Sequence, residues 1–244
     1  MTRAHFQQFY VQPDNVHNDR FVLDGEEFIH AARVLRMKTG DAIEAVDGQG
    51  NLYSGKIISM SSKELVAGIY EQQLNAGEPK LYLTLAQAVP KGSNFDLVVE
   101  KGTEIGISAF QPVITARSIV SPEARGNRWG KKALVAMKQC GRSRCPDILP
   151  PLDFTAALEL YTRDLLIIAH ESHAETRTDL DKRIASATRV TLFIGPEGGF
   201  TAEEFARALQ FGALPMNLGP RRLRSETAGL VAAIKILDMA RELE

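Results

Sequence analysis

Short runs of alternating apolar and polar residues fill the first part of the chain. They lie between Asp-Gly and Lys-Thr-Gly-Asp turns, at residues 21–23, 42–46, 51–60 and 64–70. Alternation with a period of two is typical of half-buried strands, whereas the apolar spacing over 26–35 is that of a helix. The pattern therefore predicts a small β-barrel with one inserted helix.

From residue 81 onward, apolar runs typical of buried strands alternate with helical segments. The segments are 81–89, 94–105, 109–115, 131–140, 165–170 and 190–194. This alternation predicts an α/β domain with a mostly parallel sheet. The tract 73–80 is polar and contains Gly and Pro, so we expect a linker there, between a first domain at 1–72 and a second at 81–244.

A glycine-rich loop follows the apolar run 190–194 and reads Gly195-Pro196-Glu197-Gly198-Gly199. Glycines let a ligand approach the main chain closely, and ligands of open α/β sheets bind outside the carboxyl ends of the strands. Thr201 and Glu204 form a capping box that predicts the start of the next helix. The loop therefore predicts one wall of a ligand pocket, with an ordinary strand-to-helix turn as the alternative. The nucleotide motifs GxxxxGK[ST] and GxGxxG are absent from the chain, which argues against a nucleoside triphosphate or NAD.

A second loop, LGPRRLRSETA at 218–228, follows a short predicted strand at 213–218 that Pro215 weakens. A final helix is expected to run to about residue 241, with Ser225 or Thr227 as its N-cap. Three arginines crowd the start of this helix: Arg221, Arg222 and Arg224. Because positive charge opposes the helix dipole there, local stability does not explain them. They favour an anionic partner, and a solvated basic turn is the alternative.

The two loops, with segments upstream, resemble the RsmE family, the 16S ribosomal RNA uridine-N3 methyltransferases of the SPOUT superfamily. The upstream segments are HxxxVLR at 30–36, GD at 40–41, DG at 47–48, KG at 91–92, EKxxEIG at 100–106 and QxGR at 139–142. The chain departs from the family pattern at Ser225, where Thr is usual, at Cys140, where Ser is usual, and at Lys138, where Glu is usual.

The resemblance implies a fold and an activity. The fold is a SPOUT-type knotted, mostly parallel sheet with helices on both faces and a C-terminal trefoil knot, preceded by a PUA-like RNA-binding β-barrel. The activity is methyl transfer from S-adenosyl-L-methionine to N3 of a uridine in the decoding region of 16S rRNA, uracil 1498 in standard rRNA numbering, on the small ribosomal subunit. The family is homodimeric, with each donor site near the subunit interface.

The resemblance also assigns residues to the methyl donor. They are His170, Glu171, Ile194, Gly195, Pro196, Glu197, Gly198, Gly199, Leu218, Gly219, Leu223, Arg224, Ser225, Thr227 and Ala228. For Glu197, stabilisation of its own turn is the alternative to contact with the donor.

We expect Arg224 and Glu226 to carry the chemistry. Uridine N3 must lose its proton before or during attack, and a neighbouring positive charge such as Arg224 favours the deprotonated base. Glu226 either accepts the proton or orients Arg224, or else it is a helix-start carboxylate that the dipole stabilises.

Contacts with the RNA are expected from the first domain, from a basic stretch and from the second loop. The stretch from residue 117 to 144 contains eight basic residues and a single acidic residue, Glu123, although the net charge of the whole chain is only −1. Such a local excess suits phosphates. The expected RNA-binding residues are Arg3, His30, Arg33, Arg36, Lys38, Lys91, Arg117, Arg142, Arg144, Arg221 and Arg222. For His30, a half-buried histidine without a ligand is the alternative, and for the lysines of the stretch a solvated helix face.

Composition narrows the remaining choices. The 244 residues suffice for one good core and a small satellite domain. Neither the pair Cys140 and Cys145 nor the pair His170 and His173 has enough further ligands for a metal, so we expect none. The N-terminus lacks an apolar segment, so we expect a cytoplasmic protein without a membrane span. The competing functions are a noncatalytic RNA-binding or assembly protein and a SPOUT enzyme that acts on tRNA or on 2′-hydroxyls.

Overall fold

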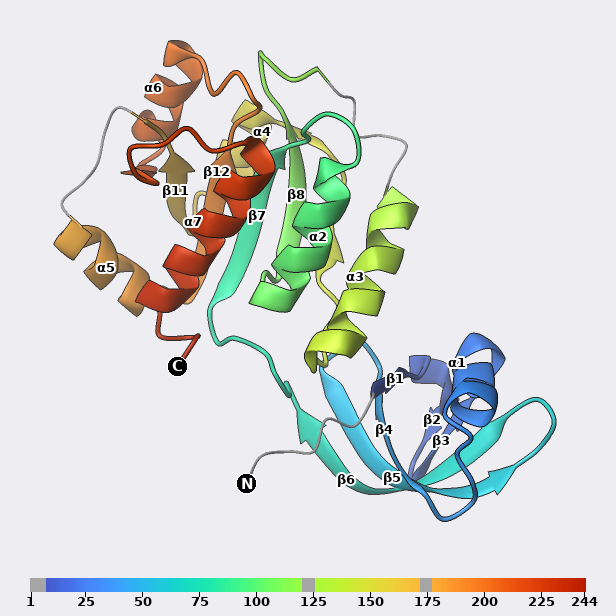
Figure 1. Ribbon diagram of the computed structural model, residues 1–244. Helices are drawn as coiled ribbons and strands as arrows, with labels where there is room; N and C mark the ends of the chain where they lie inside the picture. The colour runs from blue at the N-terminus through green and yellow to red at the C-terminus, as the bar shows by residue number, and fades with distance from the viewer. Residues whose placement is uncertain (1–7, 120–125, 172–176) are drawn as a thin grey trace. The chain divides into compact units, whose positions relative to one another are not determined.

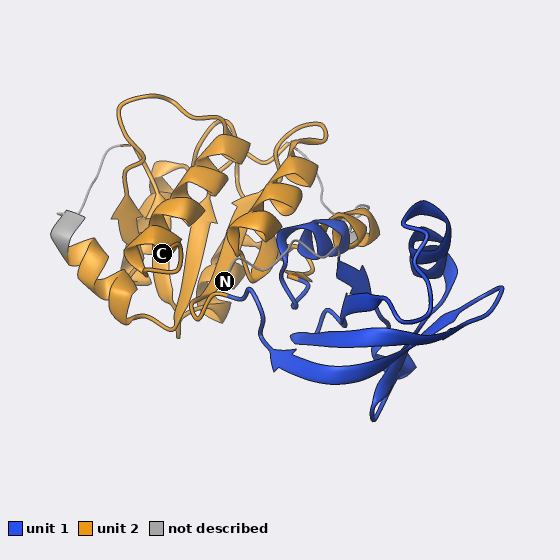
Figure 2. Cartoon of the chain, turned by 60° about the horizontal axis from the view of Figure 1, so that its bottom comes forward, with its two compact units in different colours: residues 1–78, 134–145 blue, residues 79–133, 146–244 orange. Residues whose placement is uncertain are grey.

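The computed structural model describes residues 8–119, 126–171 and 177–244. The chain divides into two compact units (Figure 2). Unit 1 consists of Met1–Glu78 and Leu134–Cys145, and unit 2 of Pro79–Ala133 and Pro146–Glu244. The division differs from the predicted one because 134–145 belongs to unit 1, where Met137 packs with Val46 and Leu52.

Unit 1 is a curled six-stranded sheet in the order β1-β4-β5-β6-β3-β2 (Figure 1). Its strands are β1 (Gln8–Tyr10), β2 (Val16–His17), β3 (Arg20–Leu23), β4 (Ala42–Val46), β5 (Asn51–Met60) and β6 (Leu65–Leu74), with a 3-10 turn, η1, at Pro13–Asn15. Strands β4 and β5 have the predicted bounds. The predicted helix is shorter, α1 (Gly25–Ile29), and continues as a π turn, η2 (His30–Val34). The core joins α1 to the sheet through Phe28, Phe9 and Phe21.

Unit 2 is built on a parallel sheet in the order β10-β8-β7-β12-β11-β13, with β9 beside β8. The strands are β7 (Tyr82–Ala88), β8 (Ala109–Ile114), β9 (Asp147–Ile148), β10 (Leu152–Asp153), β11 (Leu165–Ala169), β12 (Arg189–Ile194) and β13 (Leu214–Met216). The helices are α2 (Asn94–Ile105), α3 (Gly126–Cys140), α4 (Phe154–Leu160), α5 (Arg177–Ser186), α6 (Ala202–Gln210) and α7 (Ser225–Met239). Helix α3 begins in unit 2 and ends in unit 1.

Helices cover both faces of this sheet, as predicted. Helix α7 packs on β7 and β12, with α2 and α5 beside it, whereas α4 and α6 cover the other face (Figure 1). The core under α4 and α6 holds Phe154, Phe193 and Phe205. Since β13 pairs with β11 at one edge and α7 lies over the middle strands, the segment 217–224 crosses back over the carboxyl ends of the sheet. That crossing places the second loop beside the first.

Candidate functional site: a pocket at the carboxyl ends of three strands

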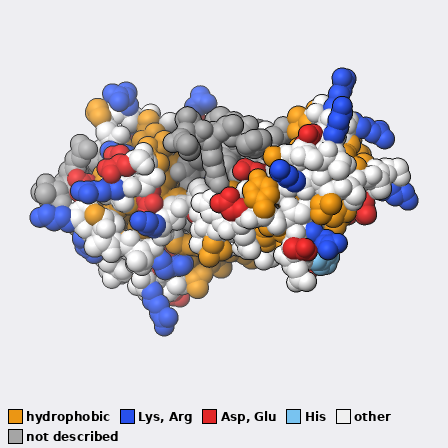
Figure 3. Space-filling view, turned by 90° about the horizontal axis from the view of Figure 1, so that it is seen from below, with side chains coloured by type: hydrophobic (Ala, Val, Ile, Leu, Met, Phe, Trp, Pro, Cys, Tyr) orange, Lys and Arg blue, Asp and Glu red, His pale blue; other side chains and the backbone are white. Residues whose placement is uncertain are grey.

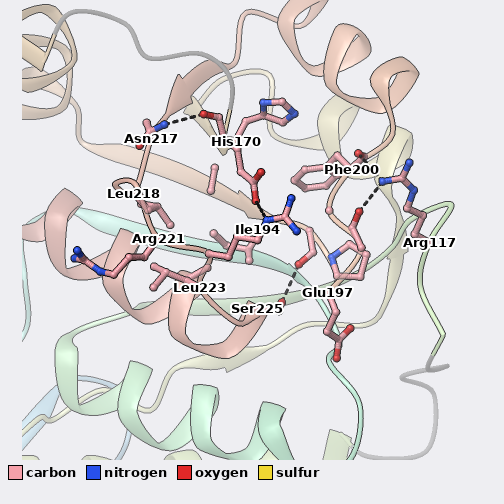
Figure 4. Close-up of a pocket in the computed structure, with 18 of the residues that line it drawn as sticks. Arg117, His170, Ile194, Glu197, Phe200, Asn217, Leu218, Arg221, Leu223 and Ser225 are labelled. Carbon is pink, nitrogen blue, oxygen red and sulfur yellow. Dashed lines mark hydrogen bonds and ion pairs between the residues drawn. The ribbon is translucent and has the colours of Figure 1, made fainter.

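A pocket of about 500 Å³ lies where β11, β12 and β13 end (Figure 4). The predicted donor residues that line it are His170, Glu171, Ile194, Gly195, Pro196, Glu197, Gly198, Gly199, Leu218, Gly219, Leu223, Ser225 and Ala228. Three predicted RNA-binding residues line it too: Arg117, Arg221 and Arg222. Ala169, Phe200 and Asn217 complete the lining, and the sequence analysis missed them.

The first loop folds back on itself over Gly195. A Cβ at that position would lie 3.2 Å from the carbonyl carbon of Gly199 and from the nitrogen of Phe200. Gly199 has a φ of +67°, and its N–H donates to the carbonyl of Pro196 at 2.8 Å. Both glycines therefore suit the shape of the loop, because a side chain at Gly195 would require the neighbouring backbone to shift and Gly199 has left-handed backbone.

The capping box after this loop is confirmed. The N–H of Thr201 donates to Glu204 Oε2 at 2.8 Å, and the N–H of Glu204 donates to Thr201 Oγ1 at 3.1 Å. At the same helix start, a backbone N–H, the Thr201 hydroxyl and the charge of Arg117 hold the pKa of Glu203 below its ordinary value. The box ties the loop to α6, so the loop is anchored at both ends.

The side chain of Glu197 is directed away from the pocket in Figure 4, where Arg117 stands at the rim. Glu197 Oε1 accepts a hydrogen bond from the N–H of Lys91 at 3.1 Å. This placement does not favour contact with the donor, and the hydrogen bond joins the first loop to the segment after β7 instead of closing the turn of Glu197 itself. Arg117 Nη1 donates to the carbonyl of Gly198 at 2.6 Å, so its guanidinium also holds the first loop in place.

The loop after β11 is joined to the second loop by Asn217. Asn217 Nδ2 donates to the carbonyl of Glu171 at 2.9 Å, and Asn217 Oδ1 accepts from the N–H of Gly219 at 2.7 Å. The carboxylate of Glu171 lies 3.7 Å from Arg222 Nε, and because both side chains are exposed this pair contributes about 0–1 kcal/mol. The ring of His170 stacks on Phe205 of α6, with ring centroids 3.8 Å apart. An asparagine within a Gly-containing turn is the signal that could have identified Asn217.

Ser225 is not the N-cap of α7, and neither is Thr227, which is exposed outside the pocket. The N-cap is Arg224, and no side chain caps the helix there. The Ser225 hydroxyl is used elsewhere: it donates to the carbonyl of Gly195 at 2.8 Å and accepts from Gln87 Nε2 at 3.1 Å. The prediction failed because a hydroxyl at a helix start can serve a tertiary contact as well as a cap.

The two predicted catalytic residues differ in their surroundings. The side chain of Arg224 is exposed and makes no hydrogen bond or ion pair with another residue that the structure describes. Glu226 is buried, with 8% exposure, and its Oε1 accepts from Asn94 Nδ2 at 3.2 Å. No ion pair joins the two within the described residues, so this geometry does not support orientation of Arg224 by Glu226.

Comparison with known proteins identifies the family. The RNA methyltransferase domain family matches residues 77–237, and the RNA methyltransferase PUA domain family matches 23–70. A relative from Synechocystis sp. named ribosomal RNA small subunit methyltransferase E is 31% identical, over 93% of this chain and 75% of that protein. The chain belongs to the ribosomal RNA small subunit methyltransferase E family. A relative of the same name from Buchnera aphidicola is 29% identical, over 95% of this chain and 93% of that protein.

Solved structures agree with this assignment. The structure of the ribosomal RNA small subunit methyltransferase E of Neisseria gonorrhoeae, bound to S-adenosyl methionine, matches with a TM-score of 0.84 and 29% identity, over 96% of this chain and 98% of that one. That of a probable rRNA-methyltransferase from Porphyromonas gingivalis matches with a TM-score of 0.84 and 28% identity, over 98% and 100% of the two chains. They confirm the predicted fold class, a SPOUT-type sheet with a PUA-like N-terminal unit.

The family's expected RNA-binding residues in unit 1 are partly exposed. Arg33, Arg36 and Lys38 are exposed around η2, and Arg3 lies outside the described residues. His30 is half-buried, with its ring edge-on to Phe9 at a centroid distance of 6.0 Å.

Arg142 does not support its predicted role. Its side chain is 3% exposed, and its Nε and Nη2 donate to Glu78 Oε2 at 3.1 and 2.7 Å. The N–H groups of Ser143 and Arg144 donate to the other oxygen of Glu78, at 3.0 and 2.8 Å. Arg142 is therefore a structural ion-pair residue, whereas the exposed side chain of Arg144 donates to Asn75 Oδ1.

Three basic residues of the stretch that lie on α3 also form ion pairs with carboxylates. Arg128, Lys132 and Lys138 pair with carboxylates of Asp96, Glu100 and Glu27, in that order. In Figure 3, Lys and Arg side chains stand among acidic and apolar ones on the face shown. The local charge excess in the sequence therefore overestimates the charge available to phosphates.

Within the described residues, no group of three or more His, Cys, Asp or Glu side chains is placed to hold a metal ion. His173, half of the predicted pair, lies outside them. No helix in this part of the chain is long and apolar enough to cross a bilayer.

Proposed function

We propose that this protein transfers a methyl group from S-adenosyl-L-methionine to N3 of a uridine in 16S rRNA of the small ribosomal subunit, at position 1498 of standard numbering. The observation that carries the proposal is the pocket, which is lined by three loops and is followed in the second loop by Arg224, whose side chain has no partner within the described residues and which immediately precedes the lining residue Ser225. The family assignment and the named relatives support rRNA methylation. The choice of atom and nucleotide rests on the resemblance.

The pocket fits the methyl donor in size and chemistry. Its volume of about 500 Å³ lies in the range of small-molecule sites. Ile194, Leu218 and Leu223 would offer apolar contact to the adenine of a bound donor, and the backbone of the glycine-rich loops would offer hydrogen-bond partners to its polar groups. A relative of known structure is bound to S-adenosyl methionine, which supports the same ligand here.

The protein's own residues supply positioning and charge. When bound, the donor supplies an electrophilic methyl group on a sulfonium. Arg224 favours the deprotonated form of N3 through its positive charge, and its exposure leaves it accessible to an RNA. The pocket loops fix the donor so that the attacking nitrogen can be aligned with it, which is a proximity effect. N3 of a paired uridine is blocked, so the substrate nucleotide must be unpaired or flipped out.

A methylation assay tests the proposal. The protein is incubated with labelled S-adenosyl-L-methionine and small ribosomal subunits from a strain that lacks this gene, and the product is mapped by digestion and mass spectrometry. We expect one 3-methyluridine per subunit at the proposed position. If no methyl group is incorporated, the proposed enzymatic activity is excluded. If the methyl group is found on another atom or on tRNA, the assigned target changes. Naked 16S rRNA in parallel distinguishes the free RNA from the assembled subunit.

We also propose that the protein is a cytoplasmic homodimer, as the resemblance implies. Light scattering on the purified chain tests the oligomeric state, and a monomer at micromolar concentration would contradict it.

A further inference from the structure

Gln87 is a fully buried polar residue in the middle of the sheet of unit 2. It lies near the carboxyl end of β7, on the same face as Leu83 and Leu85 by the strand period of two. Its neighbour in the register is Ile194, the residue before the first pocket loop. A buried amide is costly unless it is hydrogen-bonded, so an apolar side chain would be the simpler filling for this position.

The amide of Gln87 is instead the start of a hydrogen-bonded chain. Its Nε2 donates to the carbonyl and to the hydroxyl of Ser225, at 3.0 and 3.1 Å. The Ser225 hydroxyl then donates to the carbonyl of Gly195 at 2.8 Å, a contact drawn in Figure 4. Three elements that are far apart in the sequence are thus joined: strand β7, the first turn of α7 and the first pocket loop.

Helix α7 has a matching space for this amide. A Cβ at Gly229 would lie 2.4 Å from Gln87 Oε1, so only glycine lets the helix pass over the amide in its present position. Gln87 Oε1 has no hydrogen-bond partner in the described part of the chain, so the polar atom is tolerated without stabilising the core. Packing alone does not account for the pair Gln87 and Gly229.

We propose that Gln87 is a positioning residue that sets the distance between the two loops of the donor pocket. Gln87 is not among the residues found to line the pocket, and it acts through Ser225 and Gly195, which do. The inference rests on the proposed function in one respect: the ligand whose affinity it governs is S-adenosyl-L-methionine.

Gln87→Leu tests the proposal, with Gln111→Leu as the matched control. Gln111 is also a buried glutamine, on the adjacent strand β8, and its amide contacts Pro150 and Tyr161 instead of the pocket. Calorimetry with S-adenosyl-L-methionine should show about tenfold weaker binding for Gln87→Leu, equivalent to about 1.4 kcal/mol. Gln111→Leu should bind as the wild type does while its thermal stability falls at least as much. Equal affinities of Gln87→Leu and wild type, or equal losses in both variants, would overturn the proposal.

Two further results separate the possible failures. If the wild type does not bind the donor, the proposed function fails, and the inference about Gln87 falls with it. If Gln87→Leu does not fold, Gln87→Glu keeps the shape and can donate to Ser225 only when its carboxyl is protonated. Its donor affinity should then weaken with rising pH in a step that the wild type lacks, and a profile identical to that of the wild type would contradict the positioning role.

Discussion

Removal of the Ser225 hydroxyl should weaken donor binding as well as the fold. Ser225 is 4% exposed and is the one residue that joins the first turn of α7 to the first pocket loop by a side-chain hydrogen bond among the described residues. Ser225→Ala deletes the donor to the carbonyl of Gly195 and one of the two acceptors of Gln87 Nε2, which keeps the Ser225 carbonyl. The carbonyl of Gly195 then lacks its hydrogen bond from Ser225, which anchors the first pocket loop to α7.

The size of the effect follows from that uncompensated carbonyl. Loss of one partner from a buried hydrogen bond costs about 1–3 kcal/mol. If half of that cost, about 0.5–1.5 kcal/mol, falls on donor binding, the dissociation constant for S-adenosyl-L-methionine rises about 2- to 12-fold, since each 1.4 kcal/mol is tenfold. The same energy lowers the melting temperature by about 2–4 °C per kcal/mol for a chain of this length.

Calorimetric titration of the donor and a thermal melt measure the two consequences separately. Thr191→Val is the control. Thr191 lies on β12, the strand that leads into the first pocket loop, and its buried hydroxyl donates to Asp164 Oδ2 at 2.7 Å. Its melting temperature should fall by about as much as that of Ser225→Ala, while its affinity for the donor stays that of the wild type. A Ser225→Ala protein that melts early but binds the donor unchanged would refute the reasoning, since the hydroxyl would then serve the fold alone.

Four other perturbations have expected outcomes. Arg224→Ala should lower kcat about 100-fold with little change in donor affinity, whereas Arg222→Ala should mainly raise the KM for RNA; a full-rate Arg224→Ala enzyme would remove this arginine from the chemistry. Arg142→Ala leaves the buried carboxylate of Glu78 unpaired and should destabilise unit 1 by about 3–5 kcal/mol in urea unfolding, and an unchanged midpoint would contradict a structural role. Burial, then nearby negative charge, raises the pKa of Tyr161 to about 12 from 10. Its neutral form therefore contributes stability that is complete below pH 10 and is lost as the pH rises toward 12; melts between pH 9 and 11 should show a smaller decline for Tyr161→Phe than for the wild type.

Features that depend on neighbouring residues could be predicted from the sequence. The capping box of Thr201 and Glu204 closes within four residues, so its atoms are brought together by the helix start itself. Strands β4 and β5 also have their predicted bounds, because a half-buried strand shows its period in its own residues. Short strands such as β1 and β9 were missed, since each is only a few residues long and is defined by its partner strand.

The distribution of surface charge was the feature that the sequence predicted least well. Eight basic residues between 117 and 144 predict a phosphate-binding surface, but a count along the chain does not include carboxylates that the fold brings from elsewhere. Lys132 lies beside Glu100 of the neighbouring helix, and Lys138 beside Glu27 of unit 1. Arg221 and Arg222 of the second loop remain exposed at the pocket, so these arginines, which oppose a helix dipole, are still accessible to an anionic partner.

The same distinction explains why the loops were found from the sequence and their support was not. A loop must contain its own glycines, because positive φ and close backbone approach are properties of single residues such as Gly199 and Gly195. The residue that holds two loops together can lie anywhere, and here it is Gln87, 138 positions before the serine that it contacts. A glutamine within an apolar strand is therefore a reason to search the fold for a polar partner, and in this sheet that partner leads directly to the pocket.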